Sequence, residues 1–138
     1  EHNTGAVSGA WWQGKYCLDG TPVGYGVYEI NGSEVTWYFK SVGKDRDHQM
    51  RVYAPYSTDA FGEDLVVNIW NWDKNWRVEW FEDGIRIGEA GLEFSWIAPV
   101  KTDHLFRAIP LNRKAKINVV ATDPFGRKYT ATIQQQSL

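Results

Sequence analysis

The stretch KINVVATDPFGRKYTATIQ, residues 116–134, decides the fold class of this chain. Two runs of alternating apolar and polar residues, 116–122 and 128–134, flank the turn signal Pro-Phe-Gly at 124–126. A three-residue loop places the proline in a type I turn and the glycine at the left-handed bulge position. It also puts the apolar residues of both runs on one face, whereas a four-residue loop would place them on opposite faces. We therefore predict an antiparallel hairpin.

A second hairpin is predicted over residues 24–40, around the dipeptide Asn-Gly. A two-residue turn at this dipeptide would set Glu29 opposite Glu34, which is a destabilising like-charge pair. A four-residue loop pairs Glu29 with Thr36 instead and keeps the apolar residues of both strands on one face. We therefore predict the longer loop, from Asn31 to Glu34.

The middle of the chain predicts a tryptophan-rich hairpin. A strongly apolar run at 64–72 and a returning strand at 76–82 are separated by a polar turn, so the two are expected to pair. The signal Asp-Gly then leads into a strand at 85–88 and places Trp80 opposite Ile87. The face that results is predicted to be core near Val78 and Trp80, and it contains Trp70, Trp72, Trp76, Val78, Trp80 and Ile87.

Shorter segments complete an all-β pattern. Strands are predicted at 49–53 and 104–109, and residues 96–99 are expected to be extended because Pro99 disfavours helix before it. No amphipathic helix longer than two turns is visible. Eight or so short strands with turn signals between them are typical of a β-sandwich. We therefore predict an all-β fold, a β-sandwich that is immunoglobulin-like in its C-terminal half.

Composition and charge exclude several classes of function. A chain of 138 residues fits one domain, and a net charge of −2 gives no strong attraction to nucleic acid or to an anionic membrane. No apolar run is long enough to span a bilayer. Cys17 is the only cysteine, so an internal disulfide and a cysteine-based zinc site are excluded. We expect neither nucleic acid nor a membrane span among its partners.

Catalytic chemistry finds little support in the residue pattern. The only acid–histidine neighbours are Asp47-His48 and Asp103-His104, and adjacent strand residues point to opposite faces, so neither pair chelates a metal as it stands. The serines lack a Gly-x-Ser-x-Gly context. We expect no catalytic residue, metal site or cofactor in this domain. Asp103 and His104 are kept as contact candidates and are expected to form a structural hydrogen-bond pair in the loop after Pro99.

The eight tryptophans are the unusual feature of the composition. Exposed tryptophan and tyrosine rings stack on the apolar faces of sugars, on bases and on cations. Trp11 and Trp12 cannot both face one core if they lie on a strand, and Trp72 and Trp76 lie at a predicted hairpin tip. These four rings are our candidates for contacts with a ligand or a neighbouring domain. The alternative for each single ring is packing in an aromatic core.

Nine short segments form an ordered set: GAWW at 9–12, DGTPVGY at 19–25, WYFKSVG at 37–43, QMRVY at 49–53, NIWNWD at 68–73, WRVEWFEDG at 76–84, WIAP at 96–99, TDHLFRA at 102–108 and ATDPFG at 121–126. In this order they resemble the C-terminal domain of bacterial calcineurin-like phosphoesterases, the MetallophosC module. The resemblance extends over about residues 9–129. A longer insertion is expected between the Asp-Gly hairpin and WIAP, where only residues 85–95 are present. Any contact that such an insertion shapes would be lost or altered here.

The resemblance implies a division of labour within a longer protein. In that family the phosphoesterase chemistry, with its divalent metals and their Asp, His and Asn ligands, belongs to a separate preceding metallophosphatase domain. We therefore expect residues 1–138 to be a single non-catalytic accessory domain, excised from a longer multidomain chain. It would pack on the metallophosphatase domain and hold a phosphorylated substrate or a glycan. The family implies export by a bacterium, to the periplasm or the cell surface.

Two alternatives stay open. A stand-alone carbohydrate-binding module would use exposed tryptophan and tyrosine rings, and affinity gels of polysaccharides would detect it. A stand-alone metal-dependent phosphodiesterase would turn over an aryl phosphodiester in the presence of manganese.

Overall fold

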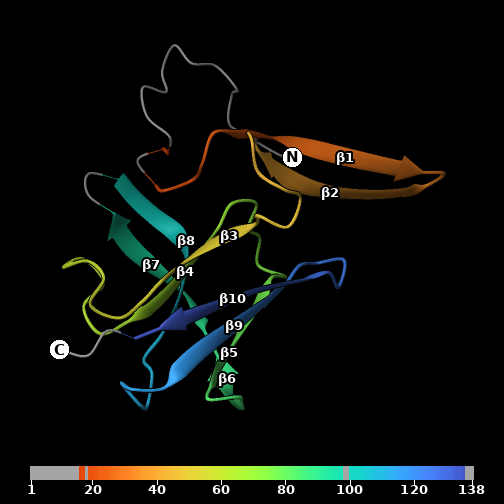
Figure 1. Ribbon diagram of the computed structural model, residues 1–138. Helices are drawn as coiled ribbons and strands as arrows, with labels where there is room; N and C mark the ends of the chain where they lie inside the picture. Colours follow the sequence, from red (N-terminus) through yellow and green to blue (C-terminus); the bar gives the residue numbers. More distant parts are fainter. Residues whose placement is uncertain (1–15, 18, 98–99, 136–138) are drawn as a thin grey trace.

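The regular secondary structure of this protein is β, as the sequence predicts. The computed structural model describes residues 16–17, 19–97 and 100–135 (Figure 1), and no helix occurs among them. The described part of the chain therefore offers no helix with the length and apolar character needed to cross a membrane. Ten strands are described: β1 (Gly24–Asn31), β2 (Glu34–Ser41), β3 (Met50–Tyr53), β4 (Leu65–Ile69), β5 (Arg77–Glu82), β6 (Ile85–Glu89), β7 (Gly91–Ile97), β8 (Val100–Ala108), β9 (Lys116–Thr122) and β10 (Lys128–Gln134).

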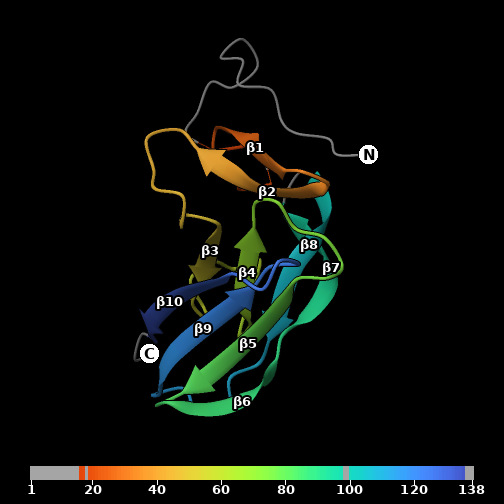
Figure 2. The same ribbon diagram turned by 90° about the vertical axis from the view of Figure 1, so that its right-hand side faces the viewer.

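These strands form three antiparallel sheets. β1 and β2 make a two-stranded sheet of their own, while the two larger sheets have the orders β10-β9-β5-β6 and β3-β4-β8-β7. From β3 onward the chain makes one hairpin in one large sheet and the next hairpin in the other. Figure 2 shows the β1–β2 hairpin at one end of the body that the two larger sheets form.

The main core takes side chains from both four-stranded sheets. Each strand that contributes places alternate residues in it, as the period of two along a strand requires. Its buried members are Leu65, Val67 and Ile69 of β4, Trp76 just before β5, Val78 and Trp80 of β5, Ala90 between β6 and β7, Phe106 and Ala108 of β8, Ile117, Val119 and Ala121 of β9, and Tyr129 of β10. Complete burial of such side chains contributes about 1.5–3 kcal/mol for each large one. The predicted burial near Val78 and Trp80 is confirmed, with exposed fractions of 1% and 9%.

The predicted hairpin between 64–72 and 76–82 is wrong. β4 pairs with β3 and β8, whereas β5 pairs with β6 and β9, so the two strands belong to different sheets. The turn itself exists, because the Trp76 amide donates to the Asp73 carbonyl at 3.1 Å. It carries the chain from one sheet to the other. All five residues of β4 are buried, which fits a central strand covered on both faces.

Both outer hairpin predictions are confirmed in register. Thr122 of β9 pairs with Lys128 of β10, and the Asp123 amide donates to the Arg127 carbonyl, which leaves residues 124–126 as the three-residue loop. Gly126 has a φ of 82°, as the left-handed bulge position requires. β1 and β2 pair Glu29 with Thr36, so the like-charge pair is avoided. The β1–β2 ladder extends closer to the turn than expected, because Asn31 also pairs with Glu34.

The Asp-Gly hairpin of β5 and β6 departs from its predicted register. Glu82 pairs with Ile85 as expected, but a register shift between Trp80 and Phe81 sets Trp80 opposite Gly88 rather than Ile87. A Cβ atom on Gly88 would lie 3.1 Å from the outer carbons of the Trp80 indole. The absent side chain therefore leaves room for the indole over β6, which explains why the register shifts here.

Candidate functional site

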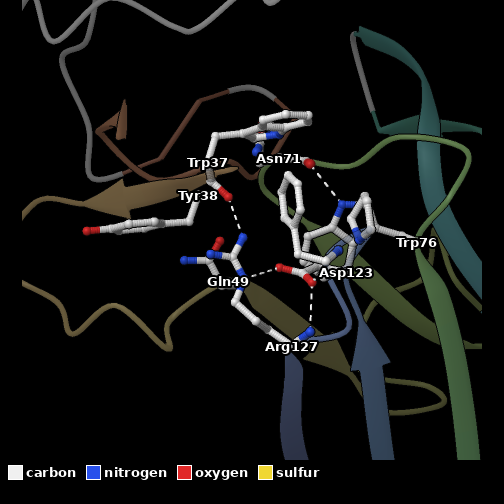
Figure 3. Close-up of a pocket in the computed structure, with 9 residues that line it drawn as sticks. Trp37, Tyr38, Gln49, Asn71, Trp76, Asp123 and Arg127 are labelled. Atoms are coloured by element: carbon white, nitrogen blue, oxygen red, sulfur yellow. Dashed lines mark hydrogen bonds and ion pairs between the residues drawn. The ribbon is translucent and has the colours of Figure 1, made fainter. Parts of the chain in front are cut away.

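The concave surface of interest lies where the β1–β2 hairpin meets the body of the molecule (Figure 3). It encloses about 180 Å³ of empty space, open solvent included, and we call it the junction pocket. The residues that line it come from β2, from the residue before β3, from the segment between β4 and β5 and from the β9–β10 turn: Trp37, Tyr38, Gln49, Asn71, Trp76, Asp123, Pro124, Phe125 and Arg127. Four separate parts of the sequence thus meet at one place.

The floor of the junction pocket is organised by the carboxylate of Asp123, which is 2% exposed. It accepts hydrogen bonds from the backbone amides of Phe125 and Arg127 at 2.9 and 2.8 Å and from Arg127 Nε at 2.5 Å. The Tyr129 hydroxyl lies 3.4 Å away as a further donor. Burial raises the pKa of the Tyr129 hydroxyl, and the Asp123 carboxylate adds to the rise. Asp123 therefore shapes the β9–β10 turn, and its acceptor capacity is used in doing so.

Arg127 joins this turn to the β1–β2 hairpin. Its guanidinium donates to the backbone carbonyl of Trp37, ninety positions earlier in the chain, while its Nε stays on Asp123. The Phe125 ring packs edge-on against the Trp37 indole, with centroids 4.6 Å apart at 88°. Such a pair contributes about 0.5–1.5 kcal/mol beyond its burial. The sequence analysis missed all three residues, because no local pattern predicts a contact between segments so far apart.

Buried polar groups hold the other side of the junction. Gln49 is 1% exposed and donates from Nε2 to the carbonyls of Phe39 and Arg46, at 2.6 Å each. The Trp76 indole donates to the Asn71 carbonyl at 3.0 Å (Figure 3). The side chains of Gln49 and Trp76 thus use their polar groups to hold the fold on this side of the junction.

The four predicted contact rings fall in different places. Trp11 and Trp12 lie outside the described residues. Trp76 is 6% exposed and is a member of the main core, stacked at a tilt on Tyr129 with centroids 5.8 Å apart. Trp72 is half-buried and packs against that core. Of the four, Trp72 is therefore the described ring that keeps some accessible surface.

Asp103 and His104 lie in strand β8, so their predicted position in a loop after Pro99 is wrong. Glu93 pairs with Leu105 and Ser95 pairs with Thr102, which leaves these two residues opposite a single residue of β7. That count is the signature of a β-bulge. Their side chains lie outside the described part of the structure, so their predicted hydrogen bond stays a prediction.

A serine and a histidine do meet beside the hairpin, in a structural role. Ser41 Oγ lies 3.0 Å from His48 Nδ1, but Ser41 is 1% exposed, so its hydroxyl is closed to a substrate. Burial, and then the positive charge of Lys44, lower the pKa of His48 below its usual value. The imidazole is therefore neutral at pH 7, as a ring inside the fold should be.

The described residues bring no set of metal ligands together. No group of three or more His, Cys, Asp or Glu side chains among them is placed to hold an ion. Two carboxylates are buried in the described part of the chain. Glu82 accepts hydrogen bonds from the amides of Leu111 and Asn112, at 2.7 and 2.9 Å, and Asp123 organises its own turn. Both are acceptors for backbone groups, which is a structural use of a buried charge.

Comparison with known proteins identifies a family. No curated protein and no solved structure matches the chain significantly. A family model does match, over residues 1–90, which is a shorter range than the resemblance to about residue 129 that the sequence analysis predicts. The matched range contains the β1–β2 hairpin and ends after β6. Because the match covers more than half of the sequence, the chain belongs to the MetallophosC family, the C terminal of calcineurin-like phosphoesterase.

Proposed function

We propose that this chain is a non-catalytic accessory domain that packs on the catalytic part of a calcineurin-like phosphoesterase. The observation that carries the proposal is the match of residues 1–90 to a family described as the C-terminal part of such enzymes. In this proposal the divalent metals and the phosphate chemistry belong to the catalytic part, which precedes this domain in the chain. The domain supplies a rigid support and a surface for contact.

The use of the buried polar side chains supports a structural role. Asp123, Glu82 and Gln49 all bind backbone groups of their own fold. The shared core of the two four-stranded sheets supports the finer proposal that they form a β-sandwich. The candidate contacts with the catalytic part, a glycan or a phosphorylated substrate are then Trp11, Trp12, Trp72, Asp103 and His104, since Trp76 is buried in the core. We also propose export by a bacterium, which the family resemblance alone supports.

The test compares the 138-residue chain with the full-length phosphoesterase that contains it. The isolated chain should give no turnover of an aryl phosphodiester with manganese, whereas the full-length protein should. In calorimetry, this domain should unfold at a higher temperature when it is linked to the catalytic part, because packing stabilises only the folded form. Turnover by the isolated chain that His48→Ala or His104→Ala abolishes would overturn the proposal.

The carbohydrate-binding alternative requires exposed rings. Among the residues whose side chains the structure describes, the tryptophans are buried or half-buried, and the exposed aromatic side chains are Tyr16, Tyr25, Tyr28 and Tyr56. Electrophoresis of the isolated chain through gels that contain single polysaccharides tests this directly. We expect unchanged mobility, and retardation on any glycan would favour the alternative.

A further inference from the structure

The turn of the β1–β2 hairpin contains the one asparagine of this sequence that a glycine follows. The other asparagines precede Thr4, Ile69, Trp72, Trp76, Arg113 and Val119. Register pairs Asn31 with Glu34, so the loop between the strands consists of Gly32 and Ser33. All four residues are exposed, and in Figure 1 the turn lies at the end of the hairpin that is far from the body of the molecule. We call residues 31–34 the tip.

Two groups at the tip can react with each other, the side-chain amide of Asn31 and the backbone amide of Gly32. Within the described residues the Asn31 side chain forms no hydrogen bond. The Gly32 amide lies inside a two-residue loop, where the strand ladder takes no hydrogen bond from it. Gly32 has a φ of 61°, and a Cβ atom placed on it would meet nothing within 4 Å. The backbone nitrogen of Gly32 is therefore accessible, and no side chain shields it.

We propose that Asn31 is a site of spontaneous deamidation and that its conversion loosens the tip. The Gly32 nitrogen gives up its proton and attacks Asn31 Cγ, and the bond from Cγ to the side-chain nitrogen breaks as ammonia leaves. The product is a cyclic imide. Water opens it at Cγ to give aspartate, or at the backbone carbonyl carbon to give isoaspartate, whose main chain runs through the side chain. In sum, an amide and a water molecule become a carboxylate and an ammonium ion.

The last pair of the hairpin must open before the imide can form. Asn31 lies at the end of an extended strand, so its Cα–C bond has to rotate before the Gly32 nitrogen reaches Cγ. That rotation breaks only the pair with Glu34. Neither β1 nor β2 pairs with a third strand within the described residues, and the end of a two-stranded hairpin frays at little cost. Glycine has no side chain to resist the rotation.

The turn between β5 and β6 is a similar sequence in a protected setting. Asp83 precedes Gly84, and such a pair forms the same imide with loss of water instead of ammonia. However, the Asp83 carboxylate accepts a hydrogen bond from the Lys116 amide at 2.9 Å, and the Asp83 amide donates to the Lys116 carbonyl at 3.0 Å. A third strand, β9, thus holds this turn in place. In the folded chain we therefore expect the reaction at Asn31 and not at Asp83.

Deamidation sets two carboxylates opposite each other at the tip. The new acid at position 31 faces Glu34 across the ladder and lies on the same face as Glu29. Arg46 already forms an ion pair with Glu29 at 2.9 Å. Like charges directly opposite each other destabilise paired strands, and isoaspartate also adds a carbon atom to the main chain of a two-residue turn. The tip therefore opens more often after the reaction. None of these steps needs a catalytic part, so they hold independently of the accessory role.

The first test follows the 138-residue chain by peptide mapping while it is kept folded in mildly alkaline buffer at body temperature. The peptide with residues 31 and 32 should gain the mass difference between an acid and an amide, and it should separate into an aspartate and an isoaspartate form. Asn31→Gln should abolish the gain, because glutamine has to form a larger ring. The matched control Asn75→Gln changes an exposed asparagine that precedes Trp76, and it should leave the gain intact.

The second test measures what the new charge does to the hairpin. Asn31→Asp places the carboxylate there from the start. Amide hydrogen exchange at the tip should become faster by up to about fivefold, as expected for a like-charge pair across two strands. The neutral variant Asn31→Ser should show a smaller increase. The midpoint of thermal unfolding should stay the same in both variants, because this opening is local.

Three results would overturn the inference. If the chain unfolded in urea gains the acid mass at residue 31 and the folded chain does not over the same period, the ladder protects Asn31. A gain that persists in Asn31→Gln would assign the reaction to another residue. Equal exchange at the tip in the unchanged chain and in Asn31→Asp would show that the hairpin tolerates the carboxylate, so that deamidation does not loosen it.

Discussion

The β9–β10 hairpin and the β1–β2 hairpin have the same design and different surroundings. Each alternates apolar and polar residues around a glycine-containing turn, and each adopts the register that its sequence predicts. In β9 the apolar residues Ile117, Val119 and Ala121 are completely buried. In the β1–β2 hairpin burial is complete only near Phe39, and Ile30 is 73% exposed. The alternation thus defines a face, and other elements decide what covers it.

The two hairpins also meet each other. The β9–β10 turn reaches the β1–β2 hairpin through Arg127 and Phe125, which contact Trp37. The buried β9–β10 hairpin therefore anchors the more exposed β1–β2 hairpin. Changes in the core should affect both hairpins, whereas changes at the tip should affect neither, and the predictions below test this order.

The largest effect is the difference in stability that we expect when an isoleucine is replaced by alanine in the buried hairpin and in the exposed one. Ile117→Ala removes a fully buried side chain and should lower the free energy of unfolding by about 2–5 kcal/mol. Ile30→Ala, at an exposed position, should change it by less than about 0.5 kcal/mol. Urea unfolding of both variants measures the difference. Similar losses would mean that Ile30 is packed within this chain.

The next effect concerns the turn that anchors the exposed hairpin. Asp123→Ala leaves the Arg127 guanidinium and two turn amides without their buried acceptor, so we expect a loss of about 2–3 kcal/mol. Thermal unfolding gives the loss, and amide exchange should show faster opening of β2. Asp59→Ala, at an exposed aspartate, is the control and should be nearly neutral. An equal effect of the two substitutions would contradict the role of Asp123.

A smaller effect is expected at the base of the exposed hairpin. A Cβ atom on Gly24 would lie 2.6 Å from the Lys40 carbonyl oxygen and would collide with the Phe39 ring. Gly24→Ala should therefore cost about 1–3 kcal/mol. Gly91→Ala, with nothing within 4 Å of the new methyl group, serves as the control. Comparison of their unfolding midpoints checks the prediction, and a stable Gly24→Ala variant would show that the base can relax.

The smallest effect is a dependence on pH. The pKa of His48 is lower in the folded protein than in the unfolded chain, because burial and Lys44 disfavour the imidazolium. The unfolded state then binds the proton more readily, so stability is complete above about pH 6.5 and falls as the pH drops below it. His48→Asn, which keeps a polar atom for Ser41, should flatten this part of the curve. Denaturation at a series of pH values tests it, and an unchanged slope would assign the dependence to another group.

The candidate site could be predicted only in part. Alternation and turn chemistry placed both outer hairpins in register, since these signals act over neighbouring residues. They did not reveal that β4 and β5 lie in different sheets, because a buried central strand and a hairpin strand have the same apolar pattern. The junction pocket was missed for a related reason. Its residues come from segments as far apart as Trp37 and Arg127.

The sequence by itself determined the all-β class, the faces of both outer hairpins and the family. Each of these depends on short-range order: a period of two, a turn residue or an ordered set of motifs. Only the tertiary structure decided which faces are covered. It buried Trp76, left Trp72 partly accessible and left Ile30 and Val35 exposed on the β1–β2 hairpin. Burial depends on which distant strands meet, and loop closure between distant segments leaves no local signal in the residues that it brings together.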